Sequence, residues 1–265
     1  MAGDRLTEQE YWNDYWGEFA LPAEIKKSNN LYINEILNTF DRYLPKDNRL
    51  SILEIGGAPG QYLAYMHRQF GYHVNSLDYS ETGCKITREN FKLLNIHGTI
   101  YEKDFFSEEP ALPQFDIVYS LGLVEHFSDL DLIIGKHLDL LKPGGILLIG
   151  APNYLGIYQF FLKRLAPGLL SLHNLRTMDV RTWRSFEDTF RLEPVFKGYV
   201  GGPEANLLNR CETKSLVNTL LRGSARGVGR LTQSHFKVLR KINSRNISGY
   251  VLGIYKKPLA GRDTA

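Results

Sequence analysis

The chain has 265 residues, of which 43% are hydrophobic and 23% are charged, and its formal net charge is +3. This length predicts one domain with insertions, or one domain with a small cap, and the composition allows a sizeable core. No stretch reaches the ~18 consecutive apolar residues that a membrane-spanning helix needs, and the polar N-terminus does not read as a secretory signal. The two cysteines, Cys84 and Cys211, make neither a disulfide framework nor a metal-binding spacing, so we expect a cytoplasmic protein without a metal site.

The charge is distributed unevenly along the chain. Residues 205–265 carry twelve lysines and arginines but only two acidic residues, a net charge of +10, so residues 1–204 carry −7. A basic segment on an acidic body indicates an anionic substrate, a membrane surface or nucleic acid. A solvated helical face explains it equally well.

Two helices are predicted before the first strand. The segment 7–19 begins at Thr7, a good helix cap, and crowds four aromatic residues into six positions. The next segment has apolar residues at helical spacing and ends at Pro45. We expect residues 1–45 to form an N-terminal helical lid.

From residue 46 onward, strand and helix patterns alternate. Apolar runs predict strands at 50–55, 73–77, 98–103, 115–120 and 145–151. Helical patterns lie between them at 60–70, 81–95 and 129–141. Because strands that alternate with helices form parallel sheets with right-handed crossovers, we expect an α/β domain over 46–265.

After Gly150 the pattern is looser. It predicts a helix and then two strands at 177–190, 192–200 and 248–258. The segments at about 153–176 and 205–247 read as insertions, the second basic and mostly helical. Long insertions in a compact α/β domain usually cover a functional site, so we interpret both as caps.

The first strand runs into the glycine-rich turn "SILEIGGAPGQY", residues 51–62. Glycines let the backbone turn sharply and approach a ligand, and the following helix presents its N-terminus there. Asp78 ends the next strand about 20 residues later, where an acidic side chain can accept hydrogen bonds from both ribose hydroxyls. The turn and this acid together indicate a cofactor that contains a ribonucleoside.

The turn departs from the dinucleotide fingerprint G-x-G-x-x-G/A at two positions. Ala58 stands where the second glycine would let a pyrophosphate approach, and Gln61 stands where the third would pack helix against strand. Both departures argue against NAD or FAD, and so against a nucleotide-linked oxidoreductase.

Three later segments complete the pattern. "EKDFF" places Asp104 at the end of the third strand with Phe105 beside it, "FDIVYSLGLVEHFSD" contains the fourth strand, and "LLKPGGILLIGAPN" contains the fifth. In this order and spacing, the set resembles the class I S-adenosylmethionine-dependent methyltransferases of the broad small-molecule group. The resemblance is strong over about 50–152 and weaker to 257. It implies a Rossmann-like seven-stranded sheet, mostly parallel with the last strand antiparallel, and S-adenosylmethionine as cofactor, with S-adenosylhomocysteine as product.

The resemblance also implies which positions bind the cofactor. Residues at the turn would border its methionine part, residues after the second and third strands would hold ribose and adenine, and residues after the fourth strand would contact the methionine end through their backbone. In this sequence they are Glu54, Gly56, Gly57, Ala58, Gly60, Asp78, Tyr79, Asp104, Phe105, Ser120, Leu121 and Gly122.

The methyl acceptor is constrained mainly by what the sequence lacks. The D/N-P-P-Y/F tetrapeptide of amino-adenine and amide methylation would follow the fourth strand, where this chain has "SLGL". Neither cysteine is placed as the nucleophile that carbon-5 pyrimidine methylation needs. Nucleic acid is therefore disfavoured as a partner, and a small-molecule acceptor is favoured.

His126 is the candidate catalytic base, since the pKa of a histidine lies near working pH, and His173 is a second candidate. The alternative is that His126 only packs the loop before the next helix. Aromatic residues complete the candidates. Those of the first predicted helix, some of which would close over the cofactor as a lid, are Tyr11, Tyr15 and Trp16. Those of the first insertion, which would form a substrate wall, are Tyr154 and Tyr158. These aromatic residues could equally be ordinary core.

We therefore expect methyl transfer to an oxygen or nitrogen of a small molecule, such as a natural product, a glycan precursor or a lipid-like acceptor. Two alternatives stay open. One is a membrane-peripheral methyltransferase of a lipid-linked substrate, whose basic 205–247 segment rests on anionic lipid. The other is a non-catalytic module that binds an adenosyl cofactor.

Overall fold

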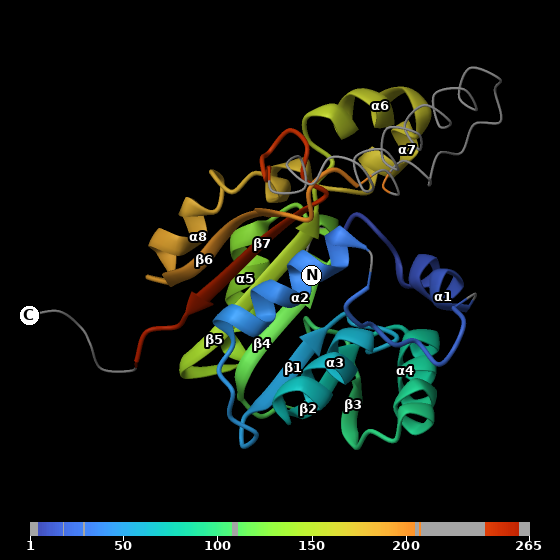
Figure 1. The fold of residues 1–265 in the computed structure, drawn as a ribbon, viewed down its shortest axis with the longest axis vertical. Coiled ribbons are helices and arrows are strands. Elements are labelled where there is room, and N and C mark those ends of the chain that lie inside the picture. The colour runs from blue at the N-terminus through green and yellow to red at the C-terminus, as the bar shows by residue number, and fades with distance from the viewer. Residues whose placement is uncertain are drawn as a thin grey trace, which may run out of the picture.

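The computed structural model describes residues 5–17, 19–28, 30–107, 111–204, 207 and 242–259. Their centre is a seven-stranded sheet in the order β3-β2-β1-β4-β5-β7-β6 (Figure 1). Strands β1 to β5 pair in parallel, and β7 pairs antiparallel with both β5 and β6. This confirms the predicted Rossmann-like sheet, mostly parallel with its last strand antiparallel. The strands are β1 (Ser51–Ile55), β2 (His73–Asp78), β3 (Gly98–Glu102), β4 (Phe115–Leu121), β5 (Leu141–Pro152), β6 (Glu193–Val200) and β7 (Tyr250–Lys256).

Helices cover both faces of the sheet. The eight α-helices of the described residues are α1 (Gln9–Gly17), α2 (Leu31–Tyr43), α3 (Gln61–Phe70), α4 (Glu81–Leu94), α5 (Leu130–Asp139), α6 (Ile157–Leu165), α7 (Pro167–Ser171) and α8 (Arg184–Thr189). Two short 3₁₀ turns add η1 (Val124–His126) and η2 (Leu175–Met178). Helices α2 and α3 pack on one face and α5 and α8 on the other, and the two layers are visible in Figure 1.

The sheet has two cores because successive side chains of a strand point to opposite faces. In β1, Ile52 joins the cluster under α2 and α3, and Leu53 joins the cluster under α5 and α8. Both side chains are fully buried. A strand buried on both faces reads as a continuous apolar run, which is why the prediction of 50–55 lies close to the observed bounds of β1.

The segment 177–190 is not one continuous helix as predicted. It contains the end of η2, a turn and the short helix α8. The Asp179 carboxylate accepts a hydrogen bond from the backbone N–H of Arg181 at 3.1 Å, and the indole of Trp183 donates to the Thr177 carbonyl at 2.9 Å. Local side-chain bonds of this kind compete with helix formation, and they seat the fully buried Trp183 under the sheet.

The carboxyl end of β5 lies beneath α6 and α7, which form the region predicted as the first cap (Figure 1). Their buried side chains make a separate small apolar cluster. The second predicted cap, 205–247, falls outside the described residues except for 207 and 242–247. Within the described part of the chain, no helix is long and apolar enough to cross a membrane.

Asn90 of α4 ties three parts of this fold together. Its fully buried amide donates to the Ala23 carbonyl and the Pro59 carbonyl, both at 2.9 Å, and accepts from the Ala23 N–H at 2.8 Å. The N-terminal segment and the glycine-rich turn are thereby held against α4.

Replacing Asn90 by alanine should destabilise the protein by about 2–3 kcal/mol, because buried backbone groups lose their partners. Urea denaturation measures the loss. Leu93→Ala is the matched control in the same helix: its side chain is 54% exposed, so its effect should stay within about 0.5 kcal/mol. Equal effects of the two substitutions would contradict this role of Asn90.

Candidate functional site

The turn after β1 is built around a buried carboxyl group. Glu54 is 2% exposed and lies directly under the backbone of Gly57, where an added Cβ would come within 2.0 Å of the Glu54 side chain. Gly56 has a φ of +68°, a conformation that side chains other than glycine rarely adopt. Its N–H donates to the Leu77 carbonyl at 2.8 Å, which ties the turn to the end of β2. The glycines are therefore fixed by both space and conformation.

Asp78 ends β2 beside this turn and is 6% exposed. One carboxylate oxygen accepts a hydrogen bond from the Ser80 N–H at 2.9 Å. Burial raises the pKa of Asp78 to about 6, although hydrogen bonds from the backbone N–H groups of Ser80, Ala58 and Tyr79 partly oppose that rise. A buried acid at this position can still accept hydrogen bonds from a ligand.

Two cavities open at the carboxyl ends of the strands. The smaller one, cavity A, has a volume of about 50 Å³ and lies between the ends of β1, β2 and β4. The larger one, cavity B, has a volume of about 420 Å³ and extends from the glycine turn toward α2, the end of β5 and β7. The two cavities share five lining residues: Trp12, Trp16, Gly56, Gly122 and His126. They therefore adjoin one another.

Most of the predicted site residues line these cavities. Those in cavity A are Gly56, Asp78, Tyr79, Phe105, Gly122, His126 and Trp16. Those in cavity B are Glu54, Gly56, Gly57, Ala58, Leu121, Gly122, His126, Tyr15, Trp16, Tyr154 and His173. Those in neither wall are Gly60, Asp104, Ser120, Tyr11 and Tyr158.

The residues outside the walls have structural partners. The hydroxyl of Ser120 lies 2.9 Å from Nε2 of the buried His137, and Gly60 adopts a φ of +78° as the N-cap of α3. The Tyr158 hydroxyl donates to the Ile247 carbonyl at 2.9 Å and accepts from the N–H of Glu204 at 2.6 Å. Tyr158 thus anchors α6 rather than facing either cavity.

Arg5 was not predicted as part of the site, and it lines cavity A. Its guanidinium pairs with Asp104 and lies over the rings of Tyr79 and Phe106, at 4.7 and 5.0 Å from their centres. A planar cation between aromatic faces is a favourable cation–π arrangement. Arg5 and Asp104 lie 99 residues apart in the sequence, so no local sequence pattern could have predicted this contact.

Buried acids and tyrosines line the wall of cavity B. Burial raises the pKa of Glu54 to about 8, and the neighbouring charge of Asp78 adds to that rise. Glu125 and Glu204 are also buried in this wall, with Tyr32, Tyr62 and Tyr250 beside them. Among the described residues that line cavity B, none is a lysine or an arginine. The described part of this wall is therefore acidic and aromatic.

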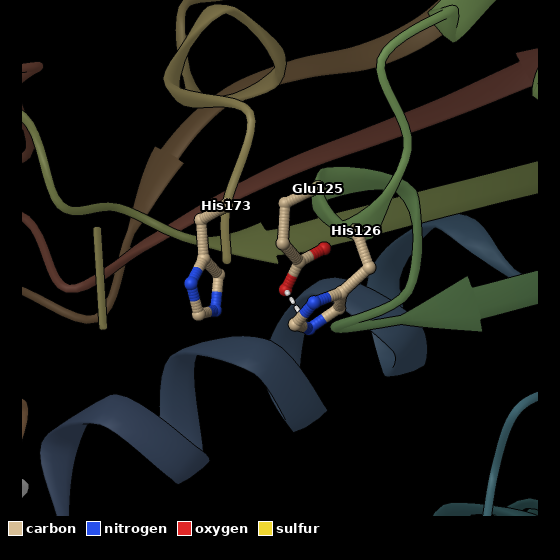
Figure 2. A group of neighbouring side chains, drawn as sticks. All are labelled: Glu125, His126 and His173. Atoms are coloured by element: carbon tan, nitrogen blue, oxygen red, sulfur yellow. Dashed lines mark ion pairs between the residues drawn. The ribbon is translucent and has the colours of Figure 1, made fainter. Parts of the chain in front are cut away.

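Glu125, His126 and His173 gather at one point of this wall (Figure 2). Nε2 of His126 lies 4.0 Å from a carboxylate oxygen of Glu125, and the two histidine rings are 4.5 Å apart. Nδ1 of His126 lies 3.0 Å from the Leu172 carbonyl, and Nδ1 of His173 lies 2.6 Å from the Leu169 carbonyl. The indole of Trp12 contacts the His126 ring edge to face.

The raised pKa of Glu54 predicts a pH-dependent stability. The Glu54 carboxyl group releases its proton near pH 4.5 in the unfolded chain and near pH 8 in the folded chain. Its contribution to the free energy of unfolding is therefore full at low pH and is lost as the pH rises through that window. Between pH 5.5 and 7.5, the wild type should lose about 2–3 kcal/mol of unfolding free energy relative to Glu54→Gln. Denaturant titrations at both pH values measure this difference. Parallel pH dependences of the two proteins would contradict it.

Comparison with known proteins agrees with this geometry. Residues 29–196 match the family model described as "Methyltransferase domain". The chain is 29% identical to a ubiquinone biosynthesis O-methyltransferase of Chelativorans sp. over 157 residues, which cover 55% of this chain and 58% of that protein. It is 25% identical to the ubiquinone biosynthesis O-methyltransferase of Mesorhizobium japonicum over 212 residues, 76% of this chain and 79% of the relative. The chain thus spans little more than half of the Chelativorans protein.

A solved structure shows the same fold across nearly the whole chain. It is geranyl diphosphate C-methyltransferase from Streptomyces coelicolor, in complex with Mg²⁺, geranyl diphosphate and S-adenosyl-L-homocysteine. The TM-score is 0.62 at 13% identity, and the match covers 94% of this chain and 98% of that one.

Proposed function

The chain belongs to the methyltransferase-domain family, and from that premise we propose that it transfers a methyl group from S-adenosylmethionine to an oxygen of a small-molecule acceptor. One observation carries the proposal. Cavity A and cavity B adjoin at Gly56, Gly122 and His126, at the carboxyl edge of a parallel sheet. Ligands of open α/β sheets bind at that edge. A donor that extends from cavity A into the turn side of cavity B, with an acceptor in the rest of cavity B, has the geometry that a direct transfer requires.

The residues of the turn suit the methyl donor. S-adenosylmethionine carries an ammonium group and a sulfonium, both cationic, and Glu54 is a buried carboxyl group at the turn. An ammonium beside it would stabilise the charged carboxylate and oppose the raised pKa. Asp78 would accept from the ribose hydroxyls, with Tyr79 and Phe105 beside the adenine. The cofactor has no phosphates, so the methyl group of Ala58 is compatible with it.

The acceptor would lie in the part of cavity B that the methyl donor leaves free, away from Glu54 and the turn. Aromatic residues of its wall, among them Tyr62, Tyr154 and Tyr250, suit a flat or hydrocarbon-bearing molecule. The named relatives are O-methyltransferases, which favours oxygen over nitrogen as the methylated atom. The acceptor hydroxyl would be deprotonated near His126 and attack the methyl carbon in line with the departing sulfur.

Helix α1 would act as the lid over the reacting groups. Trp12 and Trp16 line both cavities, and Asn13 lies 2.7 Å from the Ser80 hydroxyl at the start of α4. A closed lid keeps water away from the sulfonium and so protects it from hydrolysis. In this proposal the part of residues 1–45 that closes over the site is α1, since α2 packs on the sheet, and the first insertion, 153–176, is the cap of cavity B.

Asp78→Asn should weaken binding of S-adenosylhomocysteine by about 1.5–3 kcal/mol, because charged hydrogen bonds to the ribose are lost. Isothermal titration calorimetry measures the change in Kd. Glu102→Gln, at the exposed end of β3, is the control and should bind as the wild type does. An unchanged Kd for Asp78→Asn would remove Asp78 from the ribose site.

The activity itself can be tested with a panel of phenols, catechols, aliphatic alcohols and amines. Each is incubated with the protein and S-adenosylmethionine, and mass spectrometry searches for a product heavier by one CH₂ unit. A methylated phenol or alcohol is the expected result. Methylation of the amines alone would overturn the assignment to oxygen, and ligand binding without any transfer to the panel or to a metabolite extract would favour a non-catalytic module.

A further inference from the structure

We propose that Arg5 is a gating residue: its pairing with Asp104 closes the adenine side of the methyl-donor site, and the donor binds only after Arg5 has left that place. The identity of the donor rests on the proposed function. Arg5 lines cavity A, and only 15% of its side chain is exposed. It belongs to a segment near the start of the chain, residues 5–13, which we call the strap.

One end of the strap is attached to the turn that follows β4. The backbone N–H of Leu6 donates to the His126 carbonyl at 2.9 Å, and Arg5 forms an antiparallel backbone bridge with Phe127. Both His126 and Phe127 line cavity A. The first residues of the strap therefore pair with one wall of this cavity.

The other end of the strap is attached beyond the end of β2. The side-chain amide of Gln9 donates to the Tyr79 carbonyl, and the Ser80 hydroxyl donates to the Asn13 side chain at 2.7 Å. Figure 1 shows the helix of this end, α1, beside α4. Since β2 and β4 lie on either side of β1 in the sheet, a strap tied to both crosses the mouth of cavity A.

The strap also fills part of the space beneath it. Cavity A has a volume of about 50 Å³ with Arg5 in place. An apolar cavity of about 150 Å³ holds one benzene molecule, and adenine, with two fused rings and an amino group, needs more room than benzene. The base therefore fits in cavity A only when the Arg5 side chain moves outward.

Arg5 is held by groups that the resemblance assigns to the adenine pocket. Its guanidinium pairs with Asp104 and lies 4.7 Å from the centre of the Tyr79 ring. A second ring, Phe106, lies 5.0 Å away. Arg5 and adenine are thus alternative occupants of one place, and binding of the donor exchanges one for the other. Helix α1 can still close over the donor once Arg5 has been displaced.

The contacts of Arg5 are weak enough to open. The Asp104 side chain is 37% exposed, and an ion pair with an exposed partner contributes little and is screened by salt. The cation–π contacts add a comparable amount. Together they favour the closed strap by a factor of about ten, so the apparent Kd of the donor is about ten times its Kd for the open protein.

Binding of S-adenosylhomocysteine to the full chain tests the gating role. Arg5→Ala should bind this ligand about ten times more tightly than the wild type does, as measured by isothermal titration calorimetry. Stopped-flow fluorescence should place the gain in the association rate, because the ligand then meets an open site. Adenosine, which lacks the methionine part, should show the same gain, since only the adenine side is gated.

A second measurement needs no ligand. Trp12 and Trp16 belong to α1 and are partly exposed, whereas Trp183, the third tryptophan of the chain, is fully buried. Opening of the strap in Arg5→Ala should therefore increase the quenching of tryptophan fluorescence by acrylamide. The fluorescence of Trp183 should remain protected, and circular dichroism verifies that the variant keeps its fold.

Arg88→Ala is the matched control. Arg88 pairs with Glu102 at 3.0 Å at the end of β3, both side chains are about half exposed, and Arg88 lines neither cavity A nor cavity B. This substitution should change neither ligand affinity nor quenching.

Equal or weaker binding by Arg5→Ala would overturn the gating role while leaving the proposed function standing. S-adenosylhomocysteine that binds neither the wild type nor Arg5→Ala would contradict the proposed donor. In that case, increased quenching in Arg5→Ala would still support closure of the strap by Arg5, and unchanged quenching would overturn it.

Discussion

The buried carboxyl group of Glu54 is the constraint on which the functional edge of the sheet depends. It fills the space under Gly57, so the turn after β1 must be glycine-rich, and it lines cavity B. Its pKa of about 8 reflects the free-energy cost of burying the charged carboxylate when no cation lies beside it. A cationic ligand at the turn relieves that cost, so packing, electrostatics and ligand choice follow from one side chain.

The sequence predicted the fold and the part of the site that depends on local pattern. The alternation of strand and helix patterns was sufficient for the sheet, because the central strands β1, β4 and β5 are largely apolar runs bounded by turn residues. Gly56 follows β1 directly and Asp78 is the last residue of β2, and parallel strands bring their carboxyl ends to one edge. Both residues therefore line cavity A, and their contact with the cofactor stays a prediction.

The remaining contacts could not be predicted because they join distant segments. Arg5 reaches Asp104 across 99 residues, and His173 meets His126 only when the first cap folds over the sheet. Each histidine was a candidate base on its own, yet no spacing in the chain links the two. The helix predicted at 177–190 failed for a related reason: the side-chain bonds around Asp179 form a turn that periodicity does not reveal.

Hydrogen exchange of backbone amides, measured with and without S-adenosylhomocysteine, tests the central claim most directly. The cofactor should slow exchange at the turn after β1, at the ends of β2 and β4, and in α1 as the lid closes. The opposite edge of the sheet, around the start of β4 at Asp116, should exchange as before. Protection at that edge, or no change anywhere at saturating ligand, would contradict a methyl-donor site at the carboxyl ends of the strands.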